Sequence, residues 1–103
     1  MTYIRVAWIH QHADEPVVLY GELDAQRFEV RKIEVFRDGS IGYANAEEST
    51  HGTRLGWEPV PELDVIARDP EFSPGEITHE EFEVLWRDRA PGMSNALVLE
   101  EGA

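Results

Sequence analysis

Residues 28–44 contain the feature that most constrains the fold. An alternation of apolar residues runs into Asp38-Gly39 and resumes directly afterwards. An Asp-Gly pair between two such segments predicts a two-residue hairpin turn, because both of its residues tolerate a positive φ. This turn sets the pairing of the two strands and places Val35 opposite Gly42. We therefore expect an antiparallel sheet built around this hairpin.

The predicted register gives the hairpin two different faces. Ile33 and Val35 share one face with the small residues Gly42 and Ala44, which leaves room for a helix to lie close. Before Ile33 the alternation of apolar and polar residues shifts by one position. A bulge around Arg31-Lys32 would bring the apolar side chains on both sides of it to the same face of the strand. The opposite face mixes aromatic and charged groups and carries Lys32, Glu34, Phe36, Ile41, Tyr43 and Asn45.

Strands precede helices along the chain. Alternation predicts strands over residues 3–10 and 17–23, and residues 53–57 are a candidate short edge strand. Pro61 is suited to the first position of a short helix that stops before Pro70. A second helix begins at Thr78, which forms a capping box with Glu81, and it ends by residues 90–92.

This order of elements predicts the α+β class. We expect an antiparallel β-meander of about four strands with two short C-terminal helices on one face. Residues 1–90 form a single domain, and residues 91–103 form a C-terminal tail in which residues 96–99 are a candidate docking strand.

The charge of the chain is strongly negative and unevenly distributed. Nine basic and 21 acidic residues give a net charge of −12, of which residues 44–103 carry −10. Such a surface repels phosphates and attracts basic proteins, so we expect no nucleic-acid partner and a basic protein partner. Acidic surfaces also serve simply to keep proteins soluble, and this reading stays open.

Several classes of protein are excluded or disfavoured by composition. The absence of cysteine excludes disulfides, thiolate zinc sites and a cysteine nucleophile. The longest uncharged apolar run near the start, Val6–Ile9, is too short for a signal peptide or a membrane span. We therefore expect a cytoplasmic protein without a membrane partner.

A set of short segments recurs here in a recognisable order. They are Trp8-Ile9-His10, Glu15-Pro16, Leu19-Tyr20, Glu22-Leu23-Asp24, Phe28–Lys32, Phe36–Gly39, Gly42–Ala44, Gly52-Thr53, Leu55-Gly56, Pro59–Pro61 and Glu81-Phe82 with Trp86. In these segments the chain resembles a family of small bacterial proteins known only as a domain of unknown function. The resemblance covers about residues 1–89, whereas the tail from Ala90 departs from it. It implies a bacterial origin and a compact single domain, but no activity, substrate or catalytic residue.

The sequence supports two hypotheses about where a functional site lies. The first is a recognition surface on the mixed face of the hairpin, for which the candidate binding residues are Trp8, His10, Lys32, Glu34, Tyr43 and Trp57. The second is a site for zinc or another divalent metal made by His10, His12 and Asp14. Two imidazoles and a carboxylate are a workable ligand set.

The chain contains no arrangement typical of an enzyme. Ser49 and His51 lie two apart, but nucleophilic catalysis also needs an orienting group and an oxyanion site. We therefore favour a non-enzymatic interaction module for a basic partner, such as an immunity or inhibitor protein that covers the active site of a nucleic-acid-directed toxin. The alternative is a small metal- or ligand-binding domain, with or without enzymatic activity. A homodimer paired through edge strands is a third reading.

Overall fold

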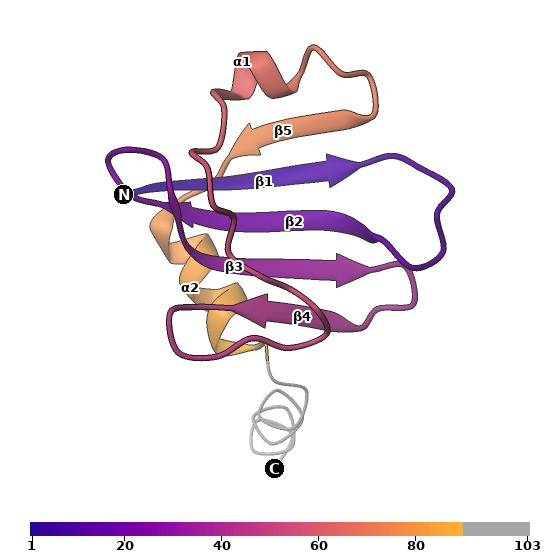
Figure 1. Cartoon of the computed structure of the whole chain (residues 1–103), viewed down its shortest axis with the longest axis horizontal. Coiled ribbons are helices and arrows are strands. Elements are labelled where there is room, and N and C mark those ends of the chain that lie inside the picture. The colour runs from indigo at the N-terminus through magenta and orange to yellow at the C-terminus, as the bar shows by residue number, and fades with distance from the viewer. Residues whose placement is uncertain (90–103) are drawn as a thin grey trace.

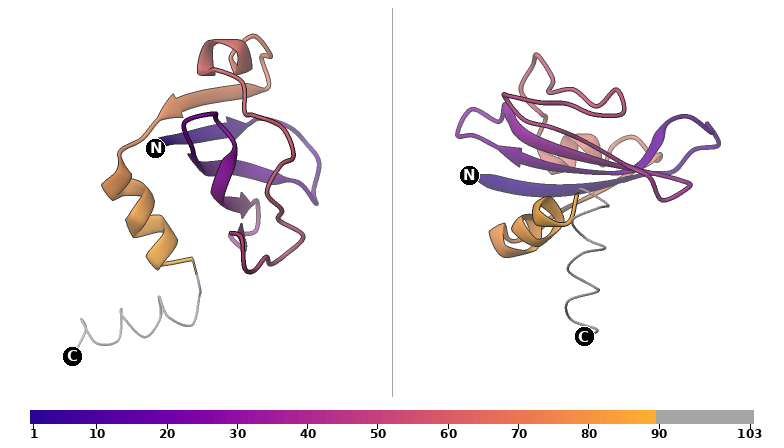
Figure 2. Two further views of the ribbon diagram at one scale, coloured as in Figure 1. Left: turned by 60° about the vertical axis from the view of Figure 1, so that its left-hand side comes forward. Right: turned by 90° about the horizontal axis from the view of Figure 1, so that it is seen from below.

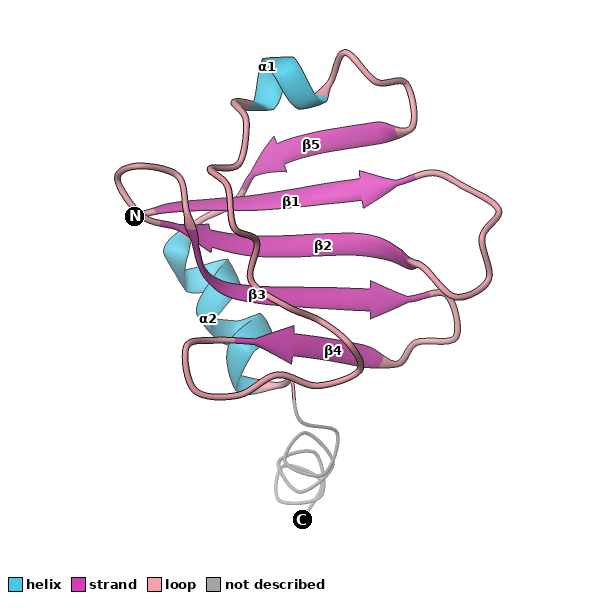
Figure 3. Ribbon diagram, in the orientation of Figure 1, coloured by secondary structure: helices cyan, strands magenta, loops and turns pink. Residues whose placement is uncertain are grey.

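Five strands and two short helices form the part of the chain that the computed structural model describes, residues 1–89. The strands form one antiparallel sheet in the order β4-β3-β2-β1-β5 (Figure 1 and Figure 3). The predicted α+β class and antiparallel sheet are confirmed, with a fifth strand beyond the meander. In chain order the elements are β1 (Thr2–Trp8), β2 (Pro16–Leu23), β3 (Glu29–Phe36), β4 (Ile41–Ala44), α1 (Leu63–Ile66), β5 (Phe72–Glu76) and α2 (His79–Arg87).

The fifth strand has no signal in the sequence. β5 pairs antiparallel with β1 at the edge of the sheet, with Pro74 opposite Val6. Its residues include Pro74 and Gly75, which are depleted in strands, and proline is tolerated only where no neighbour needs its missing N–H. The candidate edge strand over residues 53–57 is wrong, since that segment lies outside every strand. The candidate strand at residues 96–99 lies outside the described residues.

The hairpin between β3 and β4 forms, but its predicted register is wrong by one residue. Val35 lies opposite Ile41 instead of Gly42. The Phe36 N–H donates to the Ser40 carbonyl, and the Gly39 N–H donates to the Phe36 carbonyl, so the loop is one residue longer than predicted. Gly39 has a φ of +90°, as the last residue of a three-residue hairpin loop requires.

This shift turns β4 over, because neighbouring side chains of a strand point to opposite faces. Tyr43 now pairs with Ile33, whereas Ala44 pairs with Lys32. The expected mixed face with Tyr43 beside Lys32 is therefore wrong. The predicted bulge in β3 is present close to its expected place, since the register shifts between Glu29 and Arg31.

The two helices pack with different clusters of core residues, so their predicted placement on one face is not confirmed. Phe82 of α2 packs with Tyr3 and Ile33. Leu63 and Ile66 of α1 pack instead against a cluster that contains Ile4, the next residue along β1. Because Tyr3 and Ile4 point to opposite faces of the sheet, the core is divided between the two faces. In the right-hand view of Figure 2, α2 lies below the sheet.

The second helix begins as the sequence predicts. Thr78 caps it and accepts a hydrogen bond from the Glu81 N–H, while the Glu81 carboxylate accepts one from the Thr78 N–H. Ile77, just before the cap, packs against the cluster that contains Phe82, as expected for a hydrophobic staple. No helix within residues 1–89 is long and apolar enough to span a membrane.

The connection from β4 to α1 crosses the face of the sheet opposite α2 (Figure 1 and Figure 2). Thr53 in this connection is buried, and its hydroxyl donates to the Glu34 carboxylate at 2.7 Å. Gly42 makes this approach possible, because a Cβ added there would lie 2.2 Å from the Thr53 Oγ1 atom. The small residue that was expected to admit a helix therefore admits this loop.

Gly42→Ala should destabilise the protein by about 1–3 kcal/mol, because the added methyl group displaces Thr53 from Glu34. Urea denaturation followed by circular dichroism measures this change. Gly75→Ala in β5 is the matched control, since an added Cβ there meets nothing within 4 Å. Equal stability of the two variants would contradict the proposed close approach.

Candidate functional site

An open apolar cleft lies between the sheet and the segment that contains α1. Its volume is about 410 Å³. This size falls within the range of ordinary ligand pockets, roughly 300–1,000 Å³. The sheet contributes Ile4, Val6, Leu19, Tyr20, Gly21, Glu29, Lys32 and Phe72, and the segment before β5 contributes Val60, Pro61, Val65, Ile66 and Asp69.

The cleft stays open because two of its walls are short of side-chain volume. Gly21 of β2 contributes no side chain to the wall formed by the sheet. The helix α1 has a single turn and no buried residue, so it does not close against the sheet as α2 does on the other face. Val65 of α1 is 40% exposed although it lines the cleft.

A second groove adjoins the cleft and leads to an exposed tryptophan. Glu29, Lys32, Val60 and Pro61 line both depressions, so the two lie side by side. Trp57 lines the second groove and is 96% exposed. Together with the adjoining apolar cleft, Trp57 forms a single patch, and aromatic residues are enriched where proteins bind one another.

Lys32 adds no free positive charge to this region. Its ammonium group lies 3.5 Å from a Glu29 carboxylate oxygen and 3.8 Å from a Glu34 carboxylate oxygen. The same ammonium donates to the Arg54 carbonyl. Glu29 also accepts a hydrogen bond from the Gly56 N–H at 2.6 Å and so anchors the loop that carries Trp57.

The segment that borders both depressions is strongly acidic. Residues 57–71 contain five carboxylates and one basic residue, Arg68, which gives a net charge of −4. All five carboxylates are exposed. Within residues 1–89, none of the ion pairs involves Glu58, Asp64 or Asp69. These groups are available to a cationic partner.

The six candidate binding residues lie in three separate places. Lys32 and Glu34 lie on the face that carries the cleft, and Trp57 lines the adjoining groove. Trp8 and His10 lie together at the end of β1, with ring centroids 4.2 Å apart. Tyr43 lies on the opposite face, where its ring packs edge-on against Trp86 at 5.7 Å.

One of the three proposed metal ligands, His10, uses both of its ring nitrogens in hydrogen bonds. The Nδ1 atom of His10 accepts a hydrogen bond from the His12 N–H at 2.9 Å. Its Nε2 atom therefore carries the proton and donates to the Pro16 carbonyl at 2.8 Å. Because both nitrogens are used, this arrangement leaves His10 no lone pair for a metal. No cluster of three metal-ligating side chains occurs among residues 1–89.

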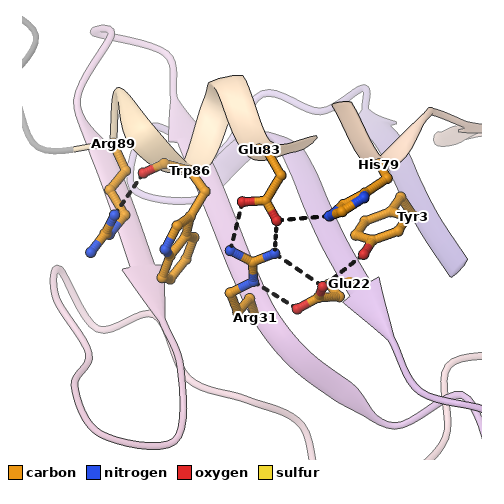
Figure 4. A network of polar contacts seen from close by, with 7 residues as sticks. All are labelled: Tyr3, Glu22, Arg31, His79, Glu83, Trp86 and Arg89. Atoms are coloured by element: carbon orange, nitrogen blue, oxygen red, sulfur yellow. Dashed lines mark hydrogen bonds and ion pairs between the residues drawn. The ribbon is translucent and has the colours of Figure 1, made fainter. Parts of the chain in front are cut away.

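A partly buried polar network on the opposite face joins three strands to α2 (Figure 4). Arg31 of β3 binds Glu22 of β2 through two hydrogen bonds of 2.6 and 3.0 Å. The same guanidinium group binds Glu83 of α2, which in turn contacts His79. Tyr3 donates its hydroxyl proton to Glu22 at 2.9 Å. The network therefore ties α2 to the sheet.

The protonation equilibria of this network do not suit acid–base catalysis. Hydrogen bonds from Arg31, together with one from Tyr3, hold the pKa of Glu22 below its ordinary value despite burial. Burial, and then the hydrogen bond to Glu22, raises the pKa of the Tyr3 hydroxyl. A catalytic acid or base needs a pKa near the working pH, whereas these shifts lead away from neutrality. We interpret the network as structural.

Sequence reasoning missed most of the cleft. Val60, Pro61 and Phe72 come from a connection and a strand that have no regular periodicity. The one usable signal is the run of carboxylates that follows Trp57, which contributes to the negative charge of residues 44–103. In the sequence Glu22 resembles an ordinary exposed polar residue of a strand. Its partner Arg31 lies on the neighbouring strand, and the pairing of the two strands is not visible in the sequence.

The family expected from the sequence is confirmed. Residues 2–91 match the family described as Domain of unknown function (DUF6881), and the chain belongs to this family. Comparison with curated proteins and with solved structures finds no match.

Excess Zn²⁺ should leave the melting temperature unchanged, because both nitrogens of His10 are already hydrogen-bonded. Differential scanning fluorimetry with and without Zn²⁺ measures this. A rise in melting temperature that disappears in His12→Ala would contradict our interpretation and establish the metal-binding alternative.

Glu22→Gln should destabilise the protein by about 1.5–3 kcal/mol at neutral pH, because it removes a charged hydrogen bond from a buried site. Since folding lowers the pKa of Glu22, its stabilising effect is complete above the ordinary value of 4.5 and is lost as the pH falls through the lower value in the folded state. Urea denaturation from pH 7 to pH 3 should therefore show the two proteins converging at acid pH. A constant difference would contradict this assignment.

Proposed function

We propose that this protein is a non-enzymatic interaction module that binds a basic protein. The observation that carries this proposal is the exposed Trp57 beside an open apolar cleft, bordered by an acidic segment of net charge −4. Apolar contact area with a charged rim is the usual composition of a protein-binding surface. Opposite charges speed the encounter of the two partners.

The concrete version of this function is an immunity or inhibitor protein for an enzyme that acts on nucleic acid. Such an enzyme has a basic substrate site, because it must bind phosphates. An acidic protein that docks there competes with the substrate for the same positive charges. We propose that this protein acts in the cytoplasm, where it would meet such a partner.

Capture from a lysate of the source cells at increasing salt tests the proposal. The tagged protein should retain a basic protein in a near one-to-one ratio, and retention should fall as salt screens the charges. The double variant Glu58→Lys with Asp64→Lys should release that protein at lower salt. Binding that is absent or insensitive to salt would contradict the proposal.

The matched control is the double variant Glu47→Lys with Glu80→Lys. It makes the same change in net charge, at exposed residues that line neither the cleft nor the adjoining groove. It should bind more tightly than the cleft-side variant. Equal loss in both variants would mean that only the total charge matters and that the acidic segment is not the docking surface.

A further inference from the structure

The cleft and its adjoining groove constrain what the basic partner presents. The walls contributed by Ile4, Val6 and Leu19, together with Val60 and Ile66, are aliphatic. A cavity of about 150 Å³ with such a lining holds a benzene molecule. The cleft, at about 410 Å³, therefore has room for a large apolar side chain together with part of its neighbours.

The charges around the cleft determine what flanks that side chain. Asp69 lines the cleft, Glu58 lines the adjoining groove, and Asp64 is exposed on α1 between them in sequence. Lys32, which lines both depressions, is paired with Glu29 and Glu34, and Arg27, which donates to the Val60 carbonyl, is paired with Glu62. A carboxylate-bearing partner would be repelled from this rim, whereas lysine or arginine side chains would find acceptors on it.

We propose that the cleft receives a large apolar side chain of the partner, flanked by lysine or arginine residues that pair with the acidic rim. This inference rests on the proposed function, because it specifies how the basic partner is recognised. Trp57 extends the contact along the adjoining groove. The apolar side chain supplies most of the affinity, and the flanking cations supply selectivity and a fast encounter.

Short synthetic peptides test this directly by NMR titration of the whole chain. The probe is a capped peptide with one phenylalanine between pairs of lysines. Its addition should shift the amide signals of Gly21, Val60 and Val65 but not those of Val84 on α2. Replacing its phenylalanine with alanine should weaken binding about 10- to 100-fold, as expected for the loss of a buried anchor.

Two further peptides separate the alternatives. A peptide with glutamates in place of the lysines should not bind. A peptide with serines in place of the lysines should bind more weakly than the lysine peptide, and equal binding would overturn the requirement for a basic partner. Equal binding of the phenylalanine and alanine peptides, or shifts centred on α2, would overturn the role of the cleft.

Variants of the protein test whether the peptide binds in the cleft. Gly21→Val fills the cleft from the sheet side, and Val65→Lys places a cation at its mouth. Both should weaken binding of the phenylalanine peptide at least roughly tenfold. Val84→Lys is the matched control, since Val84 is 46% exposed on α2 and Val65 is 40% exposed on α1. Val84→Lys should bind as the unmodified protein does.

The outcomes distinguish this inference from the function on which it rests. If the protein captures a basic partner and the cleft variants retain it fully, the function stands and the cleft proposal is overturned. If the lysate yields no salt-sensitive partner, the proposed function fails. The peptide titrations then decide independently whether the cleft recognises an apolar side chain flanked by cations.

Discussion

The contact of Arg31 with Glu22 is the interaction on which the rest of the structure depends. Glu22 is only 6% exposed, and a carboxylate in such a place is stable only when it is paired and hydrogen-bonded. Arg31 meets this need and also binds Glu83, and its guanidinium group stacks over the rings of Phe82 and Trp86. One side chain thus joins β2, β3 and α2.

The two faces of the sheet are covered unequally. The face under α2 is closed by aromatic packing and by stacked guanidinium groups, including that of Arg89 over the rings of Tyr43 and Trp86. The other face is covered only by a crossing loop and the single turn of α1, so an apolar cleft remains. The docking surface that we propose is the face that carries this cleft and the acidic segment beside it.

Sequence reasoning succeeded where the decisive contacts are local. The capping box of Thr78 and Glu81 lies within one helical turn, and the hairpin loop lies within a few residues. The predicted register of the β3–β4 hairpin was wrong by one residue, because Asp38-Gly39 fits both a two-residue and a three-residue loop. That single step moved Tyr43 to the face of Ile33 and separated it from Lys32. The six candidate binding residues therefore do not share one face of the sheet.

The sequence by itself determined the α+β class, the second helix and the negative charge, because alternation, capping and composition are local or additive properties. The tertiary structure alone decided the pairing of β5 with β1, the contact of Arg31 with Glu83 and the cleft with its adjoining groove beside Trp57. Each of these depends on residues that are distant along the chain. Their meeting is set by how the whole sheet packs, and no spacing within one segment reveals it.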